Sequence, residues 1–289
     1  MKILLFGKEG QVGFELQRSL ALLGEVIALN RQQVNLTDSA AITGSIERYR
    51  PDWIVNAAAF TAVGNAEKQA ALAMQINATA PEVMAMAAKK RGCGLLHYST
   101  DYVFDGSKTS PWLETDIASP INVYGQTKLI GEEAIQASGC QHLIVRTSWV
   151  YDARGQNFLN TMLRLAQNQP SISVVDDQIG APTWSRHIAD SSGHLLQMAK
   201  PQHSGVYHLT AAGETSWFGF AGAIFEQAAE AGIQVPSITP IASKDYPTPA
   251  RRPANSVLAC QKLYTTFGLR LPDWQASLAL VMQQKLQMD

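Results

Sequence analysis

The sequence predicts an α/β protein in which a doubly wound parallel sheet is followed by a smaller carboxy-terminal lobe. In the first half of the 289-residue chain, short apolar runs alternate with segments whose apolar residues recur at helical spacing. This alternation is typical of a parallel sheet that helices cover on both faces. After about residue 150 the alternation loosens, and five prolines gather between residues 236 and 253. We therefore divide the chain at 1–150 and 151–289, with some later segments returning to the sheet.

The elements follow from apolar runs, helical spacing and end signals. Strands of the first half are expected at 2–6, 25–29, 53–59, 94–99 and 142–150. Helices are expected at 12–23, from the capping residues 37–39 to about 50, at 72–91, and from residue 124 to about 138. Pro51 and Gly139 mark two helix ends, and we expect Pro81 to bend or split the helix that contains it. In the second half we expect strands at 171–175 and 205–209 and helices at 158–168, 187–199, 217–231 and 274–286.

Composition excludes several classes of protein. Hydrophobic residues make up 46% of the chain and charged residues 16%, which is typical of a globular protein. A net charge of −1 without a Lys/Arg-rich tract argues against nucleic acid or a membrane surface as a partner. Three scattered cysteines predict neither a disulfide framework nor a metal cluster. No apolar run reaches the roughly 20 residues of a membrane span, and the first strand starts at Lys2 without a signal peptide. We expect a cytoplasmic protein.

A glycine-rich loop joins the first strand to the first helix. Gly7 permits a tight turn, Gly10 lets the backbone approach a pyrophosphate, and Gly13 lets the helix pack on the strand. Gln11 and Val12 lie between these glycines and are expected to face the same ligand. The spacing is G-x-x-G-x-x-G, which differs from the usual G-x-G-x-x-G, and a loop that is merely rich in glycine remains the alternative. The loop's position predicts a dinucleotide site in a Rossmann-type fold.

The end of the second strand indicates which dinucleotide binds. An acidic residue there would bind the ribose 2′-hydroxyl of NADH, whereas arginine accommodates the 2′-phosphate of NADPH. This chain has Asn30 and Arg31, which favours NADPH over NADH. Asn35 and Leu36 follow on the same side and are expected to contact the cofactor. Arg31 as a solvated surface charge is the alternative.

Tyr124 and Lys128 are four residues apart, so they lie on one face of a helix. An ammonium held there would favour the tyrosinate, lower the pKa of the phenol and make Tyr124 a usable proton donor. A solvated pair is the alternative. The segment before them supplies a hydroxyl, that of Thr100, at the end of an apolar run. With the glycine-rich loop, this order of features predicts reduction of a ketone by a nicotinamide cofactor.

Several longer strings resemble a known family. The chain resembles the extended short-chain dehydrogenase/reductases, and among them the dTDP-4-dehydrorhamnose reductases, in collinear order along nearly its whole length. The strings that carry the resemblance are 56–59, 99–106, 122–128, 146–151, 177–183 and 246–256. The resemblance implies hydride transfer from NAD(P)H to the C4 carbonyl of dTDP-4-dehydro-L-rhamnose, a dTDP-linked 4-keto-6-deoxysugar, to give dTDP-L-rhamnose.

The resemblance also assigns roles to particular residues. Thr100, Tyr124 and Lys128 match the catalytic triad, and Tyr124 and Lys128 also meet the cofactor. Positions that line the cofactor are matched by Ala59, Phe60, Thr61 and Tyr98. Positions that face the sugar nucleotide are matched by Thr100, Asp101, Trp149 and Arg252. The planar guanidinium of Arg252 suits the substrate's diphosphate. An ordinary core aromatic is the alternative for Trp149.

The chain departs from the family pattern at three places. Phe60 stands where the family usually has His, and 64–65 reads Gly-Asn in place of Asp-Lys, so the hydrogen bonding of that loop must differ. Some members dimerise through magnesium held by glutamates from three segments; Glu15 matches one, but Arg186 and a glutamine near Gln283 replace the others. We therefore expect no metal site and no metal-bridged dimer, but a monomer or a weak dimer.

Other hypotheses remain open at this stage. His187 and His194, seven residues apart, could form a metal pair, but core or solvated positions explain them more simply. The enzyme could instead reduce another nucleotide-linked ketosugar. A non-catalytic module is the third hypothesis, because the family includes a regulatory subunit of methionine adenosyltransferase. The presence of Thr100, Tyr124 and Lys128 together favours catalysis.

Overall fold

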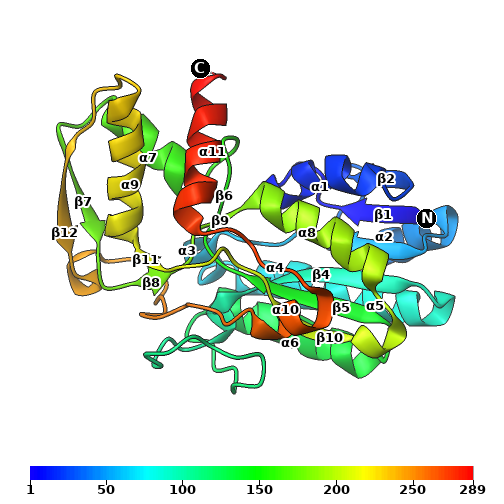
Figure 1. Cartoon of the computed structure of the whole chain (residues 1–289). Helices are drawn as coiled ribbons and strands as arrows, with labels where there is room; N and C mark the ends of the chain where they lie inside the picture. Colours follow the sequence, from blue (N-terminus) through cyan, green and yellow to red (C-terminus); the bar gives the residue numbers. More distant parts are fainter. Residues whose placement is uncertain (289) are drawn as a thin grey trace.

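One six-stranded sheet runs through the molecule, and all its strands are parallel (Figure 1). The computed structural model describes residues 1–288. In spatial order the strands are β10 (Gly205–His208), β5 (His142–Thr147), β4 (Gly94–Thr100), β3 (Trp53–Asn56), β1 (Lys2–Phe6) and β2 (Glu25–Leu29). Their central members are apolar on both sides; all four residues of β3 and all six of β5 are buried. Such strands form where helices cover both faces of a parallel sheet. The predicted α/β, doubly wound fold class is confirmed.

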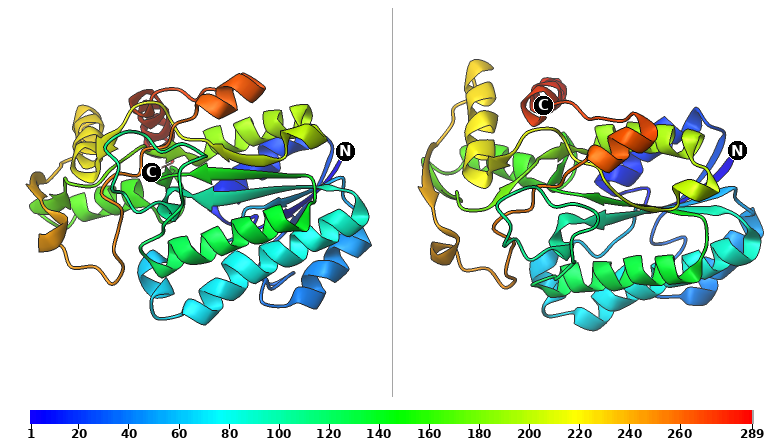
Figure 2. Two further views of the ribbon diagram at one scale, coloured as in Figure 1. Left: turned by 90° about the horizontal axis from the view of Figure 1, so that it is seen from below. Right: turned by 60° about the horizontal axis from the view of Figure 1, so that its bottom comes forward.

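Two layers of helices cover the sheet (Figure 2). On one face lie α1 (Gln11–Ala21), α8 (Ser185–Met198) and α10 (Gln261–Phe267), whose apolar residues join one core cluster. On the other face lie α2 (Ser39–Tyr49), α5 (Ala80–Arg91) and α6 (Val123–Ser138), which join a second cluster. The expected ends are present: Asp38 caps α2 by accepting from the Ala41 amide, and Gly139 ends α6 with φ +65°.

The helix expected at 72–91 is interrupted by a π-helical turn that ends two residues before Pro81. It consists of α4 (Ala70–Met74), a π-helical turn η1 (Gln75–Thr79) and α5, after the short α3 (Val63–Ala66). Pro81 lies in the first turn of α5, directly after this π-helical turn, as the expected bend or split at the proline predicts. The π turn contains Asn77, whose side chain bonds both the amide and the carbonyl of Phe60. A side-chain contact with a distant loop thus coincides with the break, and local sequence rules do not register such a contact.

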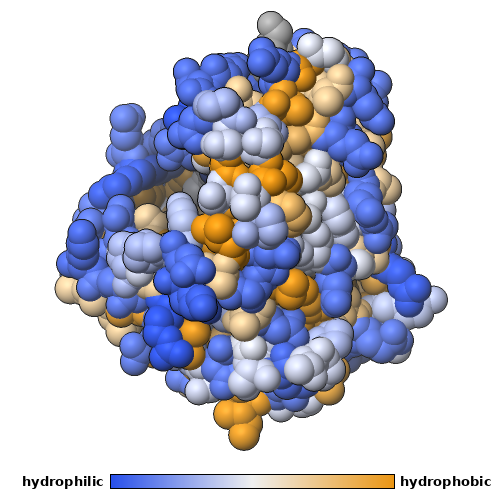
Figure 3. All heavy atoms as spheres, turned by 90° about the vertical axis from the view of Figure 1, so that its left-hand side faces the viewer, coloured by the Kyte–Doolittle hydropathy of each residue, from blue (hydrophilic) through white to orange (hydrophobic). Residues whose placement is uncertain are grey.

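The second half builds most of a separate lobe beside the sheet, with its own apolar cluster (Figure 1). Its elements are β6 (Val150–Tyr151), α7 (Phe158–Ala166), β7 (Ser171–Val175), β8 (Ile179–Gly180), β9 (Thr183–Trp184), β11 (Thr215–Ser216), α9 (Trp217–Glu230), β12 (Ser237–Ile241) and α11 (Trp274–Leu286). Short 3-10 turns are η2 (Asp101–Val103), η3 (Pro201–His203) and η4 (Ser243–Asp245). Figure 3 shows that the lobe's outer face is mostly hydrophilic, with hydrophobic residues scattered among polar ones.

The structure differs from the sequence prediction near residue 150. The strand expected at 142–150 divides into β5 and β6, because Trp149 has a left-handed backbone, φ +46°, which extended strands do not tolerate. Two later segments, β10 and α8, belong to the sheet and its covering layer. The division at residue 150 stays a prediction. Among residues 1–288, no helix combines the length and the apolar character that crossing a bilayer requires.

Candidate active site

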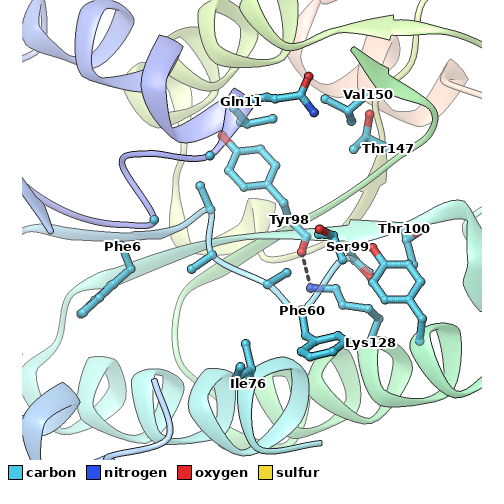
Figure 4. A pocket seen from close by; sticks show the side chains of 18 of the residues that line it. Phe6, Gln11, Phe60, Ile76, Tyr98, Ser99, Thr100, Lys128, Thr147 and Val150 are labelled. Carbon is cyan, nitrogen blue, oxygen red and sulfur yellow. Dashed lines mark hydrogen bonds between the residues drawn. The ribbon is translucent and has the colours of Figure 1, made fainter. Parts of the chain in front are cut away.

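A pocket of 690 Å³ opens at the carboxyl ends of β1, β3 and β4, where the sheet meets the lobe (Figure 4). β1 lies between β2 and β3. The chain passes from β1 to β2 on one side and then crosses over to β3 on the other, so the strand order reverses at β1. Ligands of open α/β sheets bind at this point of reversal. The pocket lining includes every residue that the sequence predicted for the cofactor and substrate except Gly13. Residues from 6 to 252 therefore meet in one site.

The glycine-rich loop forms a cradle that only glycine allows. Gly7 has φ +88°, and a Cβ there would lie 2.7 Å from the Ala58 nitrogen. A Cβ on Gly13 would collide with the Gly7 carbonyl, so Gly13 serves the packing of α1 beneath the loop. Gly10 occupies the N-cap of α1 without a side-chain cap, so helix N–H groups stay free for a ligand. These residues fit the diphosphate of a dinucleotide.

At the end of β2, where the sequence predicted the adenosine, Asn30 and Arg31 line the pocket with Asn35 and Leu36. Arg31 is exposed. Because Asn30 stands where an acidic residue would favour NADH, we expected no carboxylate here, and that expectation is wrong. The carboxylate of Glu9, from the glycine-rich loop, accepts a 2.7 Å hydrogen bond from Asn30 Nδ2. A guanidinium and a carboxylate therefore stand at the same rim.

One wall of the pocket is formed by Ala59, Phe60, Thr61 and Tyr98, which the resemblance predicted to line the cofactor. The loop that carries Phe60, one of the departures from the family pattern, is held by its backbone: Asn77 accepts from the Phe60 amide at 2.8 Å and donates to its carbonyl at 3.1 Å. Asn77 donates also to the Thr127 hydroxyl of α6. The loop is thereby tied to the helix that carries the Tyr/Lys pair.

Thr100, Tyr124 and Lys128 line the same pocket. Figure 4 shows Thr100 and Lys128 close together there. Thr100 is the last residue of β4, whereas Tyr124 and Lys128 lie in the first two turns of α6. Asn122 caps that helix by accepting from the Gly125 amide at 2.8 Å. The Tyr124 phenol forms a hydrogen bond with the Thr100 side chain. Local helix signals and one strand end thus bring the predicted triad together.

The pKa of Tyr124 differs from our expectation. Burial raises the pKa of the Tyr124 phenol above its ordinary value, and the hydrogen bond with Thr100 opposes that shift only in part. The Lys128 ammonium bonds elsewhere: Nζ donates to the Tyr98 carbonyl at 2.7 Å and lies 3.0 Å from His97 Nε2. Burial lowers the pKa of Lys128 to about 8, although Glu132 opposes the shift. The expected lowering of the phenol's pKa by the ammonium is therefore wrong for this state of the protein.

Thr100 and Asp101 share one hydrogen bond, in which the Thr100 hydroxyl donates to Asp101 at 2.9 Å. Burial raises the pKa of Asp101 to about 7, with hydroxyls of Ser256 and Thr100 opposing the shift. A hydroxyl has one hydrogen to give. Thr100 can direct it to a substrate carbonyl when Asp101 is protonated and donates in turn. In the structure that hydrogen is directed to the Asp101 carboxyl.

Two stacked tryptophans form the wall on the side of the lobe. Trp149 and Trp217 lie with ring centroids 3.5 Å apart and planes at 4°. Trp149 lines the pocket in its left-handed conformation, so it is not an ordinary core aromatic. Arg252 lines the same cavity, and the preceding Arg251 carbonyl accepts from Asn122 Nδ2 at 2.8 Å. The cap of the catalytic helix thus also positions the segment of Arg252.

The other residues singled out by the sequence have partners away from the pocket. Glu15, which is 3% exposed, accepts from Arg186 Nε at 3.0 Å and from Arg18 Nε at 3.3 Å. His187 Nδ1 and His194 Nε2 lie within 3.3 Å of different atoms, the Ser277 hydroxyl and the Phe267 carbonyl respectively. Within residues 1–288 no three His, Cys, Asp or Glu side chains group as metal ligands would.

Four residues of the site escaped the sequence analysis: Glu9, Asn77, His97 and Trp217. Glu9 lay inside the glycine-rich loop and His97 inside the expected strand 94–99, so the sequence placed both residues but indicated no role for either. Asn77 and Trp217 fell inside expected helices and gave no signal. Their contribution depends on tertiary contacts.

Comparisons with known proteins agree along the whole chain. A family model described as the RmlD substrate binding domain matches residues 1–287. A dTDP-4-dehydrorhamnose reductase of Burkholderia thailandensis is 48% identical, with 99% of each chain covered. A crystal structure of a dTDP-4-dehydrorhamnose reductase from Clostridium acetobutylicum superposes with a TM-score of 0.93 at 37% identity, covering 100% of both chains. Another, from Bacillus anthracis in complex with NADP, has a TM-score of 0.92 at 32% identity, with 98% of this chain and 99% of that chain covered.

Proposed function

The chain belongs to the family of the RmlD substrate binding domain, and from this premise we propose that it reduces the C4 carbonyl of dTDP-4-dehydro-L-rhamnose to give dTDP-L-rhamnose. The resemblance inferred from the sequence motifs is thereby confirmed. The protein is an oxidoreductase that uses NADPH, as the relative in complex with NADP supports. The observation that carries the proposal is the meeting of Thr100, Tyr124 and Lys128 in one pocket with a glycine cradle at its other end.

In the proposed reaction each residue has a distinct task. The cradle of Gly7 and Gly10 holds the cofactor's diphosphate, and Lys128 holds the nicotinamide ribose. When bound, the reduced nicotinamide supplies the hydride that the C4 carbon accepts. Tyr124 gives its phenolic proton to the oxygen as the alkoxide forms, and Thr100 donates a hydrogen bond to that oxygen. A phenol with a raised pKa stays protonated at neutral pH, which suits a proton donor.

The sugar nucleotide would lie along the wall formed with the lobe. Arg252 suits the substrate's diphosphate, because a guanidinium binds phosphate oxygens through two parallel hydrogen bonds. The stacked pair of Trp149 and Trp217 offers a flat apolar surface beside the reacting carbon. Asp101, which lines the same pocket, would meet a hydroxyl of the sugar. In this proposal the lobe at 151–289, together with Trp149, supplies most substrate contacts.

Incubation with dTDP-4-dehydrorhamnose and NADPH tests the proposal, with NADPH oxidation followed by absorbance and the product identified by NMR. We expect oxidation that depends on the ketosugar and a product of rhamnose configuration. A talose-type product would show that the sugar ring lies differently over the nicotinamide. Oxidation absent under all conditions, with a partner enzyme co-purifying, would favour a regulatory module instead.

Two finer points belong to the same proposal. We propose that the enzyme works in the cytoplasm, where nucleotide sugars and NADPH are made. We propose also that it is a monomer or a weak dimer without a bridging metal, since two guanidinium groups bind the Glu15 carboxylate. Sedimentation with and without a chelator distinguishes these states.

A further inference from the structure

One acidic side chain lines the pocket without a task in the proposed reaction: Glu9, from the glycine-rich loop. The loop is tied to the end of β2, because the Gly7 and Lys8 amides both donate to the Leu29 carbonyl, at 3.0 and 3.3 Å. Leu29 is the last residue of β2, and Asn30 follows it. Glu9 is thereby brought beside the position where an acidic residue would bind the adenosine ribose of NADH.

The hydrogen bonds of Asn30 fix which way its amide points. Its oxygen accepts from the Gln33 backbone amide at 3.1 Å, and its own backbone N–H donates to Gln33 Oε1 at 3.0 Å. Because a backbone N–H can only donate, the Asn30 oxygen must face Gln33, and the NH₂ group must face the other way. There Nδ2 donates to Glu9 Oε1 at 2.7 Å, a length typical of charge-assisted bonds. Asn30 therefore holds the Glu9 carboxylate in place.

The second oxygen of the Glu9 carboxylate is open to a ligand. Within residues 1–288 the carboxylate has Asn30 as its one hydrogen-bond partner, and it forms no ion pair with Arg31. Glu9 is exposed and lines the pocket, so its second oxygen can accept from a bound molecule. A carboxylate accepts hydrogen bonds and repels phosphate. The ligand group that suits this oxygen is therefore a hydroxyl or an N–H group.

NADH and NADPH differ at one place, the 2′ position of the adenosine ribose. NADH has a hydroxyl there, which can donate to a carboxylate, and NADPH has a phosphate, which a carboxylate repels. Arg31 follows the same strand, lines the same pocket and suits the phosphate. The rim at the end of β2 thus offers one charged side chain to each cofactor.

We propose that Glu9 accepts a hydrogen bond from the ribose 2′-hydroxyl of NADH, and so takes over the task of the acidic residue that the end of β2 lacks. The inference rests on the proposed reductase function and names the residue through which its cofactor site takes NADH beside NADPH. Asn30 is the positioning residue that holds the carboxylate, and Arg31 serves the phosphate of NADPH. The acid comes from the glycine-rich loop because that loop is tied to β2.

Titration of the purified protein with each cofactor, followed by nicotinamide fluorescence, tests the inference on binding alone. Glu9→Gln keeps the length of the side chain and an acceptor for Asn30, but it removes the charge. We expect its Kd for NADH to rise about fivefold, the difference between a charge-assisted and a neutral hydrogen bond. Its Kd for NADPH should not rise, because a repelling charge is lost. An unchanged Kd for NADH would overturn the inference.

The analogue 2′-deoxy-NADH, which lacks the hydroxyl in question, shows whether the contact is direct. The wild-type protein should bind NADH about tenfold more tightly than this analogue, and Glu9→Gln should shrink that preference about fivefold. The Kd of Glu9→Gln for the analogue itself should equal that of the wild type. Equal losses of NADH and the analogue would mean that the carboxylate acts through the shape of the glycine-rich loop, against the proposal.

The double variant Glu9→Gln/Asn30→Asp is a rescue, because the amide and the carboxylate exchange places. The charge then returns to the rim from the end of β2, its usual position in NADH sites. We expect NADH to regain most of the affinity that Glu9→Gln loses. No recovery would mean that NADH does not need a carboxylate here, which would refute the proposal.

Glu25→Gln is the matched control. It removes an exposed carboxylate from the other end of β2, where Lys2 is its partner, and its affinities should equal those of the wild type. None of these titrations needs a ketosugar. If the protein reduces no ketosugar, they still decide the role of Glu9. Reduction of the ketosugar by a protein whose NADH binding does not depend on Glu9 would refute the inference and leave the proposed function intact.

Discussion

The two ends of the pocket differ in how firmly the fold holds them. At the inner end, Thr100, Asp101 and Lys128 are 5%, 3% and 1% exposed, and each side chain bonds to another group of the protein. At the adenosine end, Arg31 and Glu9 are exposed. Burial shifts the pKa values of Asp101 and Lys128 toward neutral pH, and groups that exchange protons near neutral pH need such values. Because Arg31 and Glu9 are exposed, substitutions there should leave the core undisturbed, and any effect should appear in cofactor binding.

The inner end is firm because two elements are locked together there. Arg146 of β5 and Glu132 of α6 form a buried ion pair, with Nη2 and Oε2 2.6 Å apart. The Asn122 cap fixes the start of α6 and also binds the Arg251 carbonyl. Arg31, in the loop after β2, makes no hydrogen bond or ion pair with the part of the chain that the structure describes, residues 1–288. Variants at the two ends should therefore fail in different ways.

The largest effect should come from removing the proton donor. Tyr124→Phe should lower kcat by about 10²–10⁴-fold with either cofactor, because it removes the proposed proton donor to the alkoxide. The KM values for the cofactors should change little. Tyr207→Phe is the control, since it removes a phenol that donates to the His203 carbonyl at 2.8 Å, away from the pocket. Near-normal turnover by Tyr124→Phe would contradict the mechanism.

A second test concerns the buried lysine and stability. The folded protein releases the Lys128 proton near pH 8, below the ordinary lysine value of 10.5, so between these pH values the unfolded chain binds more protons. Stability should therefore rise with pH across that window. Relative to Lys128→Met, the free energy of unfolding of the wild type should gain on the order of 3 kcal/mol. Denaturation curves of both proteins measured at several pH values between 8 and 10.5 give this difference. A difference that stays constant across the window would mean that Lys128 has an ordinary pKa.

The exposed end should respond through binding alone. If Arg31 binds the 2′-phosphate of NADPH, Arg31→Ala should raise KM for NADPH about 10- to 150-fold, the equivalent of about 1.5–3 kcal/mol, and spare NADH. Arg48→Ala, on α2 beside the Tyr49 ring, is a matched surface control. Equal losses for both cofactors would make Arg31 a structural residue, and no loss for either would make it a solvated charge.

Glu9 should have a smaller effect of opposite sign. Its carboxylate bonds Asn30 and would face the same 2′-phosphate, so Glu9→Gln should lower KM for NADPH by at most about fivefold. The KM for NADH should rise. Glu47→Gln, which removes an exposed carboxylate of α2, serves as control. A higher KM for NADPH in Glu9→Gln would mean that the carboxylate positions Asn30 for the cofactor.

The smallest expected effect is that of a chelator. Arg186 and Arg18 donate to the Glu15 carboxylate, which leaves it poorly suited to a divalent cation. Initial rates should not change with EDTA. Activity that falls with EDTA and returns with magnesium would show that a metal matters despite these contacts.

The fold and the triad were accessible from sequence because their signals are local. Strands 2–6, 25–29 and 171–175 and helix 274–286 were predicted with the bounds they have. The spacing of Tyr124 and Lys128 put both on one helix face. Acidity was not accessible, because the pKa of Tyr124 depends on burial beneath the lobe rather than on the ammonium one turn away.

Contacts between distant segments also escaped prediction. Glu9 reaches Asn30 only because the loop after β1 folds beside the end of β2. Trp217 stacks on Trp149 across 68 residues of chain, and Asn77 interrupts a helix to hold Phe60. Periodicity and capping rules describe neighbours along the chain, so they identify the elements but not these partners.

Initial rates of wild type, Tyr124→Phe and Arg31→Ala with both NADPH and NADH test most directly the claim that one end of the pocket does chemistry and the other chooses the cofactor. The account predicts that Tyr124→Phe loses kcat equally with both cofactors, whereas Arg31→Ala keeps kcat and loses affinity for NADPH alone. A fall of kcat in Arg31→Ala, or a cofactor-dependent defect in Tyr124→Phe, would contradict this division of tasks.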